Sequence, residues 1–367
     1  MNTNVLRTDE KITFRLRELY RNWGYTQYRV GKFGEYDLYM QNKNFLASEQ
    51  ILTFSDTNGK LMALKPDITL SIIKNTKDDG QTRKLFYAEN VYRVPRNAYG
   101  FQEILQTGLE CIGNVDRFAT AEVVMLAIRS LQTVSPKYVL DVSHVGIVSG
   151  ILEDENLSGP ARAALLDAVS SKNLPACEML CEKWNVSKTG TSLFKALITL
   201  SGSSDSIFRQ LTALPLPDAS RAALEELQQL YQDLLYYGDC AIHLDFSVVN
   251  DMDYYSGIVF KGFVEGIPNG ILSGGRYDNL MVKMGKRCGA IGFAVYLDQL
   301  ERFMQDHREY DVDNLILYDE TSNLETVVQH ARFLRAQGRS VRIQRNTPGS
   351  IRSAVTFRVR GSEVKEV

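Results

Sequence analysis

The spacing of apolar residues predicts the first elements of the chain. Near the N-terminus apolar positions recur every three or four residues, which predicts an amphipathic helix over residues 8–23. Two short strands are expected at residues 50–54 and 61–64. They flank Asn58-Gly59, the strongest short signal for a β-hairpin. A short helix over residues 68–74 follows.

A longer pair of strands is predicted next. The segments 84–93 and 101–113 are separated by a stretch rich in turn-forming residues. Further along, the pattern predicts a helix at 118–131, strands at 138–142, 241–246, 256–264, 270–272 and 274–275, a helix at 293–304, and finally a strand at 315–318, a helix at 323–337 and strands at 340–344 and 354–359.

Composition divides the chain. Residues 150–240 are rich in Ala, Leu, Ser, Glu and Lys and are interrupted by prolines, which predicts a helical insertion. The predicted domains are a core formed by residues 1–149 and 241–305, the insertion at 150–240, and a small α/β C-terminal unit at 306–367. Because hairpins join most strands of the core, we expect an α+β fold with a mainly antiparallel sheet, not a doubly wound one.

Composition and charge limit the classes of protein to which this chain can belong. The 367 residues are 44% apolar and 23% charged, which excludes a mostly disordered chain, and the net charge is −2. We therefore expect no general attraction to nucleic acid or to anionic membranes. The chain has neither an apolar signal core at its N-terminus nor a membrane-length apolar run, so a cytoplasmic protein with reduced cysteines is expected.

Cofactor motifs are absent from the sequence. Neither G-x-x-x-x-G-K-[ST] nor G-x-G-x-x-G occurs, so the usual phosphate-binding loops have no support. The five cysteines and four histidines are scattered, and their spacing argues against a zinc site. We predict no cofactor and no metal.

The strand at 101–113 carries the first candidate chemistry. Gln106, Gly108 and Glu110 alternate, so they share one face, and the glycine permits close approach of a ligand. Arg93 is the last residue of the preceding strand. Together with Gln106 and Glu110 across the hairpin, it could bind a ligand that carries an anionic group beside a cationic one. The alternative is a solvent-facing polar side of a sheet with a surface ion pair of little energetic value.

Two polar and aromatic clusters adjoin later strands, at residues 253–257 and 273–278. A tyrosine beside an aspartate suits a small planar cation or a neutral ring, and Gly274-Gly275 permits close backbone approach. The alternative is turn chemistry with tyrosines in the core.

Four segments, in order, resemble the catalytic domain of histidyl-tRNA synthetase, a class II aminoacyl-tRNA synthetase. They are residues 63–69 (ALKPDIT), 86–113, 253–255 (DYY) and 273–300, the last containing GAIGFA at 289–294. The resemblance spans about residues 5–305. It implies a class II core with a mainly antiparallel sheet flanked by helices.

Departures from the synthetase pattern imply that aminoacylation is lost. Asn250 stands where the resemblance places the arginine for amino-acid activation, and Gln299 stands where it places a phosphate-binding arginine. Residues 94–96 replace His-Glu-Arg, and Gly31 stands near the missing proline of motif 1. Loss of one charge-stabilising group typically costs about 10²–10³-fold in rate, so losing two predicts no adenylation.

The residues that would hold free histidine are better retained. By resemblance Asp67, Thr69 and Gln106 match the residues around the α-amino group, Glu110 and Tyr255 match those around the imidazole, and Arg93 could meet the carboxylate. Tyr254 completes the predicted histidine-binding set. A retained ligand site with a lost activation site resembles the family of ATP phosphoribosyltransferase regulatory subunits, which are synthetase paralogues.

This resemblance implies a non-catalytic subunit required by the short-form catalytic subunit in the first step of histidine biosynthesis. It also implies feedback by histidine, self-association as a dimer, and assembly with the catalytic subunit into a hetero-octamer. The tail after Leu300 has 67 residues and is not strongly basic, so no nucleic-acid partner is expected.

Three alternatives remain open. The chain could be an active histidyl-tRNA synthetase with a reduced C-terminal domain, or a solitary amino-acid-binding module. Feedback could also use a site at a subunit boundary, leaving the predicted cleft a vestige.

Overall fold

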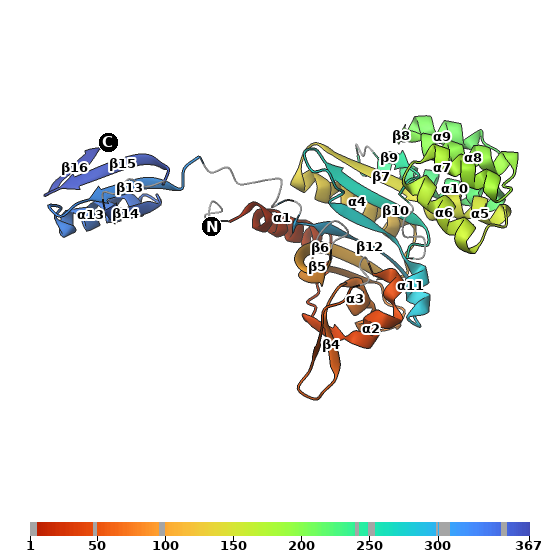
Figure 1. The fold of residues 1–367 in the computed structure, drawn as a ribbon, viewed down its shortest axis with the longest axis horizontal. Coiled ribbons are helices and arrows are strands. Elements are labelled where there is room, and N and C mark those ends of the chain that lie inside the picture. Colours follow the sequence, from red (N-terminus) through yellow and green to blue (C-terminus); the bar gives the residue numbers. More distant parts are fainter. Residues whose placement is uncertain are drawn as a thin grey trace. The chain divides into compact units, whose positions relative to one another are not determined.

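The computed structural model describes residues 6–46, 50–94, 100–238, 242–248, 254–298, 300, 309–345 and 351–367, apart from the side chain of Asn44. Two compact units divide the chain, Met1–Met304 and Gln305–Val367, and each is described by itself (Figure 1). Asn250, Gln299, Pro95, Arg96 and Asp253, on which parts of the sequence prediction rest, lie outside the described residues.

A nine-stranded sheet organises the first unit. Its order is β1-β5-β6-β12-β11-β10-β7-β9-β8, and every pair is antiparallel except β1 with β5 and β7 with β9. The mainly antiparallel sheet predicted from the hairpins is confirmed. The strands are β1 Thr26–Gln27, β5 Arg83–Arg93, β6 Gln102–Gly113, β7 Tyr138–His144, β8 Ser201–Ser203, β9 His243–Asp245, β10 Ile258–Val264, β11 Leu272–Arg276 and β12 Gly289–Tyr296.

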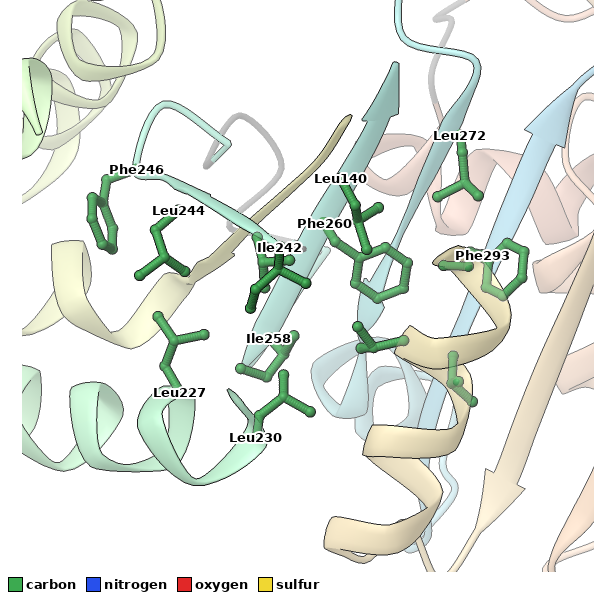
Figure 2. Close-up of a cluster of buried hydrophobic side chains, with 14 of the residues drawn as sticks. Leu140, Leu227, Leu230, Ile242, Leu244, Phe246, Ile258, Phe260, Leu272 and Phe293 are labelled. Atoms are coloured by element: carbon green, nitrogen blue, oxygen red, sulfur yellow. The ribbon is translucent and has the colours of Figure 1, made fainter. Parts of the chain in front are cut away.

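Helices α1 (Thr8–Asn22), α4 (Arg117–Val134) and α10 (Asp218–Leu235) contact one face of this sheet. Strand residues facing them are apolar, among them Leu140, Leu244 and Phe260, each fully buried. Figure 2 shows these side chains with Leu227 and Leu230 of α10. This cluster is the main hydrophobic core of the unit.

The opposite face carries a second, smaller core under α2 (Tyr36–Gln41), α3 (Thr69–Asn75) and α11 (Asp278–Lys283). A three-stranded sheet, β2 (Phe33–Glu35), β4 (Leu61–Leu64) and β3 (Thr53–Ser55), adjoins it. The hairpin predicted at Asn58-Gly59 is confirmed, because β3 pairs with β4 and Gly59 takes the left-handed backbone that the turn requires, φ +80°. The 3₁₀ helix η2 spans Lys43–Phe45.

The segment between β7 and β9 is mainly helical. It holds α5 Val145–Asp154, α6 Gly159–Ser170, α7 Leu174–Lys183, α8 Lys188–Thr199, α9 Ser204–Thr212 and α10. Three of these helices are followed by a non-glycine residue with positive φ: Asn156, Lys172 and Asn185. Asparagine tolerates this backbone, whereas lysine does so less readily. Strand β8 within this segment was not predicted.

The second unit is a small α/β structure. Strands β13 (Val312–Tyr318), β14 (Val341–Arg345), β15 (Ser353–Arg360) and β16 (Glu363–Glu366) form a sheet in the order β14-β13-β15-β16. Helix α13 (Leu324–Ala336) packs its buried side, Val327, Ala331 and Leu334, against that sheet. Strand β16 was not predicted from the sequence.

The helix predicted at 293–304 is wrong at its start, and its residues 299 and 301–304 lie outside the described residues. Residues 293–296 were expected to begin a helix, but Phe293–Tyr296 continue strand β12. This strand lies between β6 and β11 and is buried on both faces, so its apolar run has no alternation that would distinguish it from a helix. Separately, no helix among the described residues is long and apolar enough to cross a membrane.

Candidate functional site

Glu110 lies at the centre of the candidate site, on the sheet face opposite α4. Its strand β6 pairs with β5 on one side and β12 on the other, and the Glu110 side chain is almost fully buried, 2% exposed. Thr69 donates a hydrogen bond to Oε1 at 2.7 Å and Tyr277 donates one to Oε2 at 2.6 Å. Residues from α3 and from the end of β11 therefore hold this carboxyl group from two sides.

Small residues make room around Glu110. Gly292 lies opposite it on β12, and Gly108 lies opposite Ala294. A side chain at position 108 would meet the hydroxyl of Tyr87. Gln106 is also buried, 5% exposed. The alternative of a solvent-facing polar strand is therefore wrong, and the predicted shared face of residues 106, 108 and 110 is confirmed.

Burial raises the pKa of Glu110 to about 8, against an opposing effect of the hydrogen bonds from Tyr277 and Thr69. Burial also raises the pKa values of Tyr87, Tyr254 and Tyr277 well above their usual range, with the nearby Glu110 carboxyl adding to each. At neutral pH Glu110 is therefore largely a neutral acid, which can donate one hydrogen bond as well as accept them.

Asp67 and Thr69 reach this place because α3 begins there. The Asp67 carboxylate accepts a hydrogen bond from the Leu70 amide at 2.8 Å, as a side chain capping the first turn. Burial raises the pKa of Asp67, and the charge of Arg93 opposes that shift. Arg93, the last residue of β5, is therefore close enough to Asp67 for its charge to act on that carboxyl group.

Arg93 and Gln106 lie beside Tyr296. The Arg93 guanidinium carbon is 5.5 Å from the centre of the Tyr296 ring, a cation–π distance. Gln106 is the direct strand partner of Tyr296 on β12 and of Glu89 on β5. Gln106 and Glu110 share the face of β6 four residues apart, so they lie about 13 Å apart along the strand.

Tyr254 and Tyr255 enter the site just before β10. Their ring centres are 4.7 Å apart and nearly perpendicular, and Tyr254 also contacts Tyr277 at 5.6 Å. Tyr255 packs where Gly275 has no side chain. The hydrogen bond from Ser256 N to Arg276 O, 2.8 Å, ties this segment to β11.

The seven residues predicted from sequence all lie among the described residues, and the structure gathers them on one sheet face. A hydrogen bond joins Thr69 to Glu110, and a ring contact joins Tyr254 to Tyr255. Strand pairing places Gln106 beside Tyr296. Sequence reasoning missed Tyr87, Tyr277 and Gly292 as parts of the site. The signal was present for two of them, since Tyr277 lies in the cluster 273–278 and Gly292 lies in the segment 289–294.

A buried cation lies beneath the site. Lys65 is 1% exposed, and its ammonium group donates to Glu89 Oε2 and to the Val30 carbonyl, both at 3.1 Å. Burial lowers the pKa of Lys65. The Lys65 carbonyl accepts a hydrogen bond from the Tyr92 amide at 2.9 Å, so Lys65 also holds the end of β5 that carries Arg93.

The arrangement suits a small zwitterion with a polar ring. A carboxyl group that can donate or accept lies among tyrosine hydroxyls at one end. Arg93 and the Asp67 carboxyl group supply opposite charges. Such groups can bind and orient an amino acid through charge-assisted hydrogen bonds.

Comparisons with known proteins concern the chain as a whole. The family model described as Histidyl-tRNA synthetase matches residues 3–300. A protein of Clostridium kluyveri named ATP phosphoribosyltransferase regulatory subunit is 30% identical over 336 residues, covering 88% of this chain and 85% of that protein.

Solved structures extend the likeness. A Bacillus halodurans structure described as an ATP phosphoribosyltransferase regulatory subunit/histidyl-tRNA synthetase has a TM-score of 0.74 and 27% identity, over 94% of this chain and 90% of that one. A chain of the ATP phosphoribosyl transferase complex from Thermotoga maritima has a TM-score of 0.61 over 79% of this chain and 97% of its own length. At 19% identity, this second likeness is one of fold.

Proposed function

This chain belongs to the histidyl-tRNA synthetase family and, within it, to the ATP phosphoribosyltransferase regulatory subunits, and on that premise we propose that it is the regulatory subunit of an ATP phosphoribosyltransferase. Its role is to support the short-form catalytic subunit in the first step of histidine biosynthesis. The observation that carries the proposal is the 30% identity to a named regulatory subunit across 85% of that protein.

The proposed ligand is free histidine, bound by Asp67, Thr69, Arg93, Gln106, Glu110, Tyr254 and Tyr255. Glu110 and Tyr255 meet the imidazole, Asp67, Thr69 and Gln106 meet the α-amino group, and Arg93 meets the carboxylate. What supports this is the buried Glu110 carboxyl group, whose hydrogen bonds to Thr69 and Tyr277 leave lone pairs for a ligand.

Histidine binding is proposed to inhibit the assembled enzyme. That requires histidine to bind two states of the complex with unequal affinity. The chain is further proposed to act in the cytoplasm, to form a dimer and to assemble with the catalytic subunit as a hetero-octamer. An exposed apolar side chain supports the dimer: Phe33, 59% exposed, lies on the three-stranded sheet with its ring against Phe54.

The decisive experiment is reconstitution with the short-form catalytic subunit. We expect the pair to form ATP phosphoribosyltransferase that histidine inhibits. Glu110→Gln and Tyr255→Phe should each raise the histidine concentration needed for half inhibition about tenfold, since losing one partner of a buried hydrogen bond costs about 1–3 kcal/mol.

The matched controls are Glu103→Gln and Tyr92→Phe, which alter a glutamate and a tyrosine that bond each other outside the site. Both should leave inhibition unchanged. If the two site variants retain full inhibition at the normal histidine concentration, histidine is sensed elsewhere, for example at a subunit boundary.

The second candidate function is histidyl-tRNA synthetase, favoured by the family model that matches residues 3–300. Histidine-dependent ATP–pyrophosphate exchange distinguishes it. We propose that aminoacylation is lost, because Asn250 and Gln299 replace arginines in the resemblance. Exchange above background with purified protein would favour the synthetase.

A further inference from the structure

A second cluster of polar side chains lies on the same sheet face as Glu110 but on β7 and β9, which are four and five strands away from β6. One ligand atom from each of Asp141, His243 and Asp245 lies within 4.8 Å of the others. His243 Nδ1 is 2.7 Å from Asp141 Oδ1. With strands spaced about 4.8 Å apart, the cluster is about 19–24 Å from Glu110 and is separate from the proposed histidine site.

The alternation of the two strands explains why these residues meet. Asp141 pairs with His243 and Val142 pairs with Leu244 in the parallel register. Leu140 and Leu244 lie on the apolar face, Leu140 beside Phe260 and Leu244 beside Leu227 (Figure 2), so Asp141, His243 and Asp245 point to the other face. One more step of the same register places Ser143 beside Asp245.

Ser143 supplies an independent observation. It is fully buried, and its hydroxyl has no hydrogen-bond partner among the described residues. A buried hydroxyl without a partner costs about 1–3 kcal/mol, so native proteins rarely leave one without a bound species to satisfy it. By strand alternation this hydroxyl lies on the face of the cluster, next to Asp245.

The cluster already binds a positive charge. Lys172, in the turn between α6 and α7, places its ammonium group 2.6 Å from Asp245 Oδ2. Lys172 takes an unfavourable left-handed backbone with φ +52°, and its side chain is 40% exposed. It can therefore swing out to solvent and yield its place to another cation.

We propose that Asp141, His243 and Asp245, with the Ser143 hydroxyl beside them, form a binding site for a divalent transition-metal ion such as Zn²⁺. Two carboxylates neutralise the charge of the ion and one imidazole adds the nitrogen that such ions favour. Ligand atoms of a tetrahedral zinc site lie about 3.3 Å apart, so a shift of about 1 Å closes the cluster. Binding displaces Lys172.

Nothing in the sequence pattern indicated this site, since Asp141 and His243 lie 102 positions apart along the chain. The expectation of no metal rested on spacing along the chain. The proposed ion would join β7, which leads into the helical segment, to β9, which returns from it. Metal binding is therefore expected to stabilise the fold at this edge of the sheet.

Calorimetric titration of the EDTA-treated full chain with Zn²⁺ alone tests the proposal. We expect one ion per chain with a dissociation constant in the micromolar range and a rise in melting temperature. Asp141→Asn and His243→Gln should each weaken binding tenfold or more, and Ser143→Ala severalfold. Lys172→Met should strengthen binding, because it removes the competing cation.

The matched control is Asp205→Asn, an exposed carboxylate of α9, which should leave the affinity unchanged. Melting in EDTA separates loss of binding from loss of folding, and the visible spectrum of bound Co²⁺ should change in His243→Gln. No saturable Zn²⁺ binding below 1 mM would overturn the proposal. So would equal affinity in the parent, Asp141→Asn and His243→Gln, which would place zinc elsewhere, for instance at the cysteines.

Discussion

Gly292 lies directly opposite Glu110 in the pairing of β12 with β6, and a Cβ atom at position 292 would overlap Oε2 of Glu110. The buried carboxyl group therefore depends on a missing side chain one strand away. Glycine is needed here for space, since no positive φ is recorded at this position.

Gly292→Ala is the first prediction. The added methyl group must displace Glu110 and also meets the Leu109 carbonyl, so we expect a loss of about 1–3 kcal/mol in the free energy of unfolding. Histidine binding should fall with it. Urea denaturation and calorimetry measure the two effects.

Gly31→Ala is the control, because its nearest neighbour would be 3.7 Å from the new Cβ atom, an ordinary contact. If Gly292→Ala binds histidine with the same affinity as the parent protein, Glu110 does not contact the ligand.

The second prediction concerns pH. Glu110 ionises near 4.5 in the unfolded chain but only near 8 in the folded one, so the folded state binds more protons between these values. Its contribution to stability is therefore full below pH 4.5 and is lost as pH rises to about 8. The whole shift corresponds to roughly 5 kcal/mol.

Glu110→Gln removes this titration. Relative to the parent, the variant should become more stable as pH rises from 5 to 8.5, as measured by denaturant unfolding at each pH. A stability difference between the two proteins that is independent of pH would contradict the raised pKa.

Tyr277→Phe is the third prediction. It removes the 2.6 Å hydrogen bond that Tyr277 donates to Glu110 Oε2. In the parent protein this hydrogen bond lowers the pKa of Glu110. We expect the pKa of Glu110 to rise further and the free energy of unfolding to fall by about 1–3 kcal/mol. The pH dependence of unfolding, compared with that of the parent, reads out both effects.

Tyr92→Phe is the matched control, because it removes an exposed tyrosine bond to Glu103 and should cost less than about 1 kcal/mol. If Tyr277→Phe and Tyr92→Phe lower the free energy of unfolding by the same amount, burial does not strengthen the hydrogen bond between Tyr277 and Glu110.

The sequence predicted the parts of the site that depend on local order. Alternation along β6 placed Gln106 and Glu110 on one face, and Asn58-Gly59 fixed a hairpin, because both are properties of a few consecutive residues. The resemblance to a known family then grouped Asp67, Thr69 and Tyr255 with them. Local physics alone could not have done so, since these residues are far apart in the chain.

The sequence could not predict the contacts that determine the chemistry. Tyr277 lies 167 residues from Glu110, and only the fold brings its hydroxyl to that carboxyl group. The strand β12 was mistaken in part for a helix because burial on both faces removes the alternation that marks a strand. The Glu110 pKa follows from burial, which sequence does not reveal.

The fourth prediction concerns Lys65, whose ammonium group is buried with Glu89 beneath the site. Lys65→Met removes the cation and leaves Glu89 without its partner. Because the Glu89 side chain keeps 22% exposure, it can reach water, so we expect a loss of about 1–3 kcal/mol, below the 3–5 kcal/mol typical of a fully buried pair.

The control is Lys60→Met, which breaks an exposed ion pair with Glu35 and should leave stability nearly unchanged, because water screens such a pair. The double variant Lys65→Met/Glu89→Leu should recover much of the loss, because no charge is left without a partner. If the double variant is no more stable than Lys65→Met alone, the energetic role of Lys65 lies instead in its 3.1 Å bond to the Val30 carbonyl. That hydrogen bond holds the segment before β2 against the end of β4. In that case the charge of Glu89 would not contribute to the free energy of unfolding.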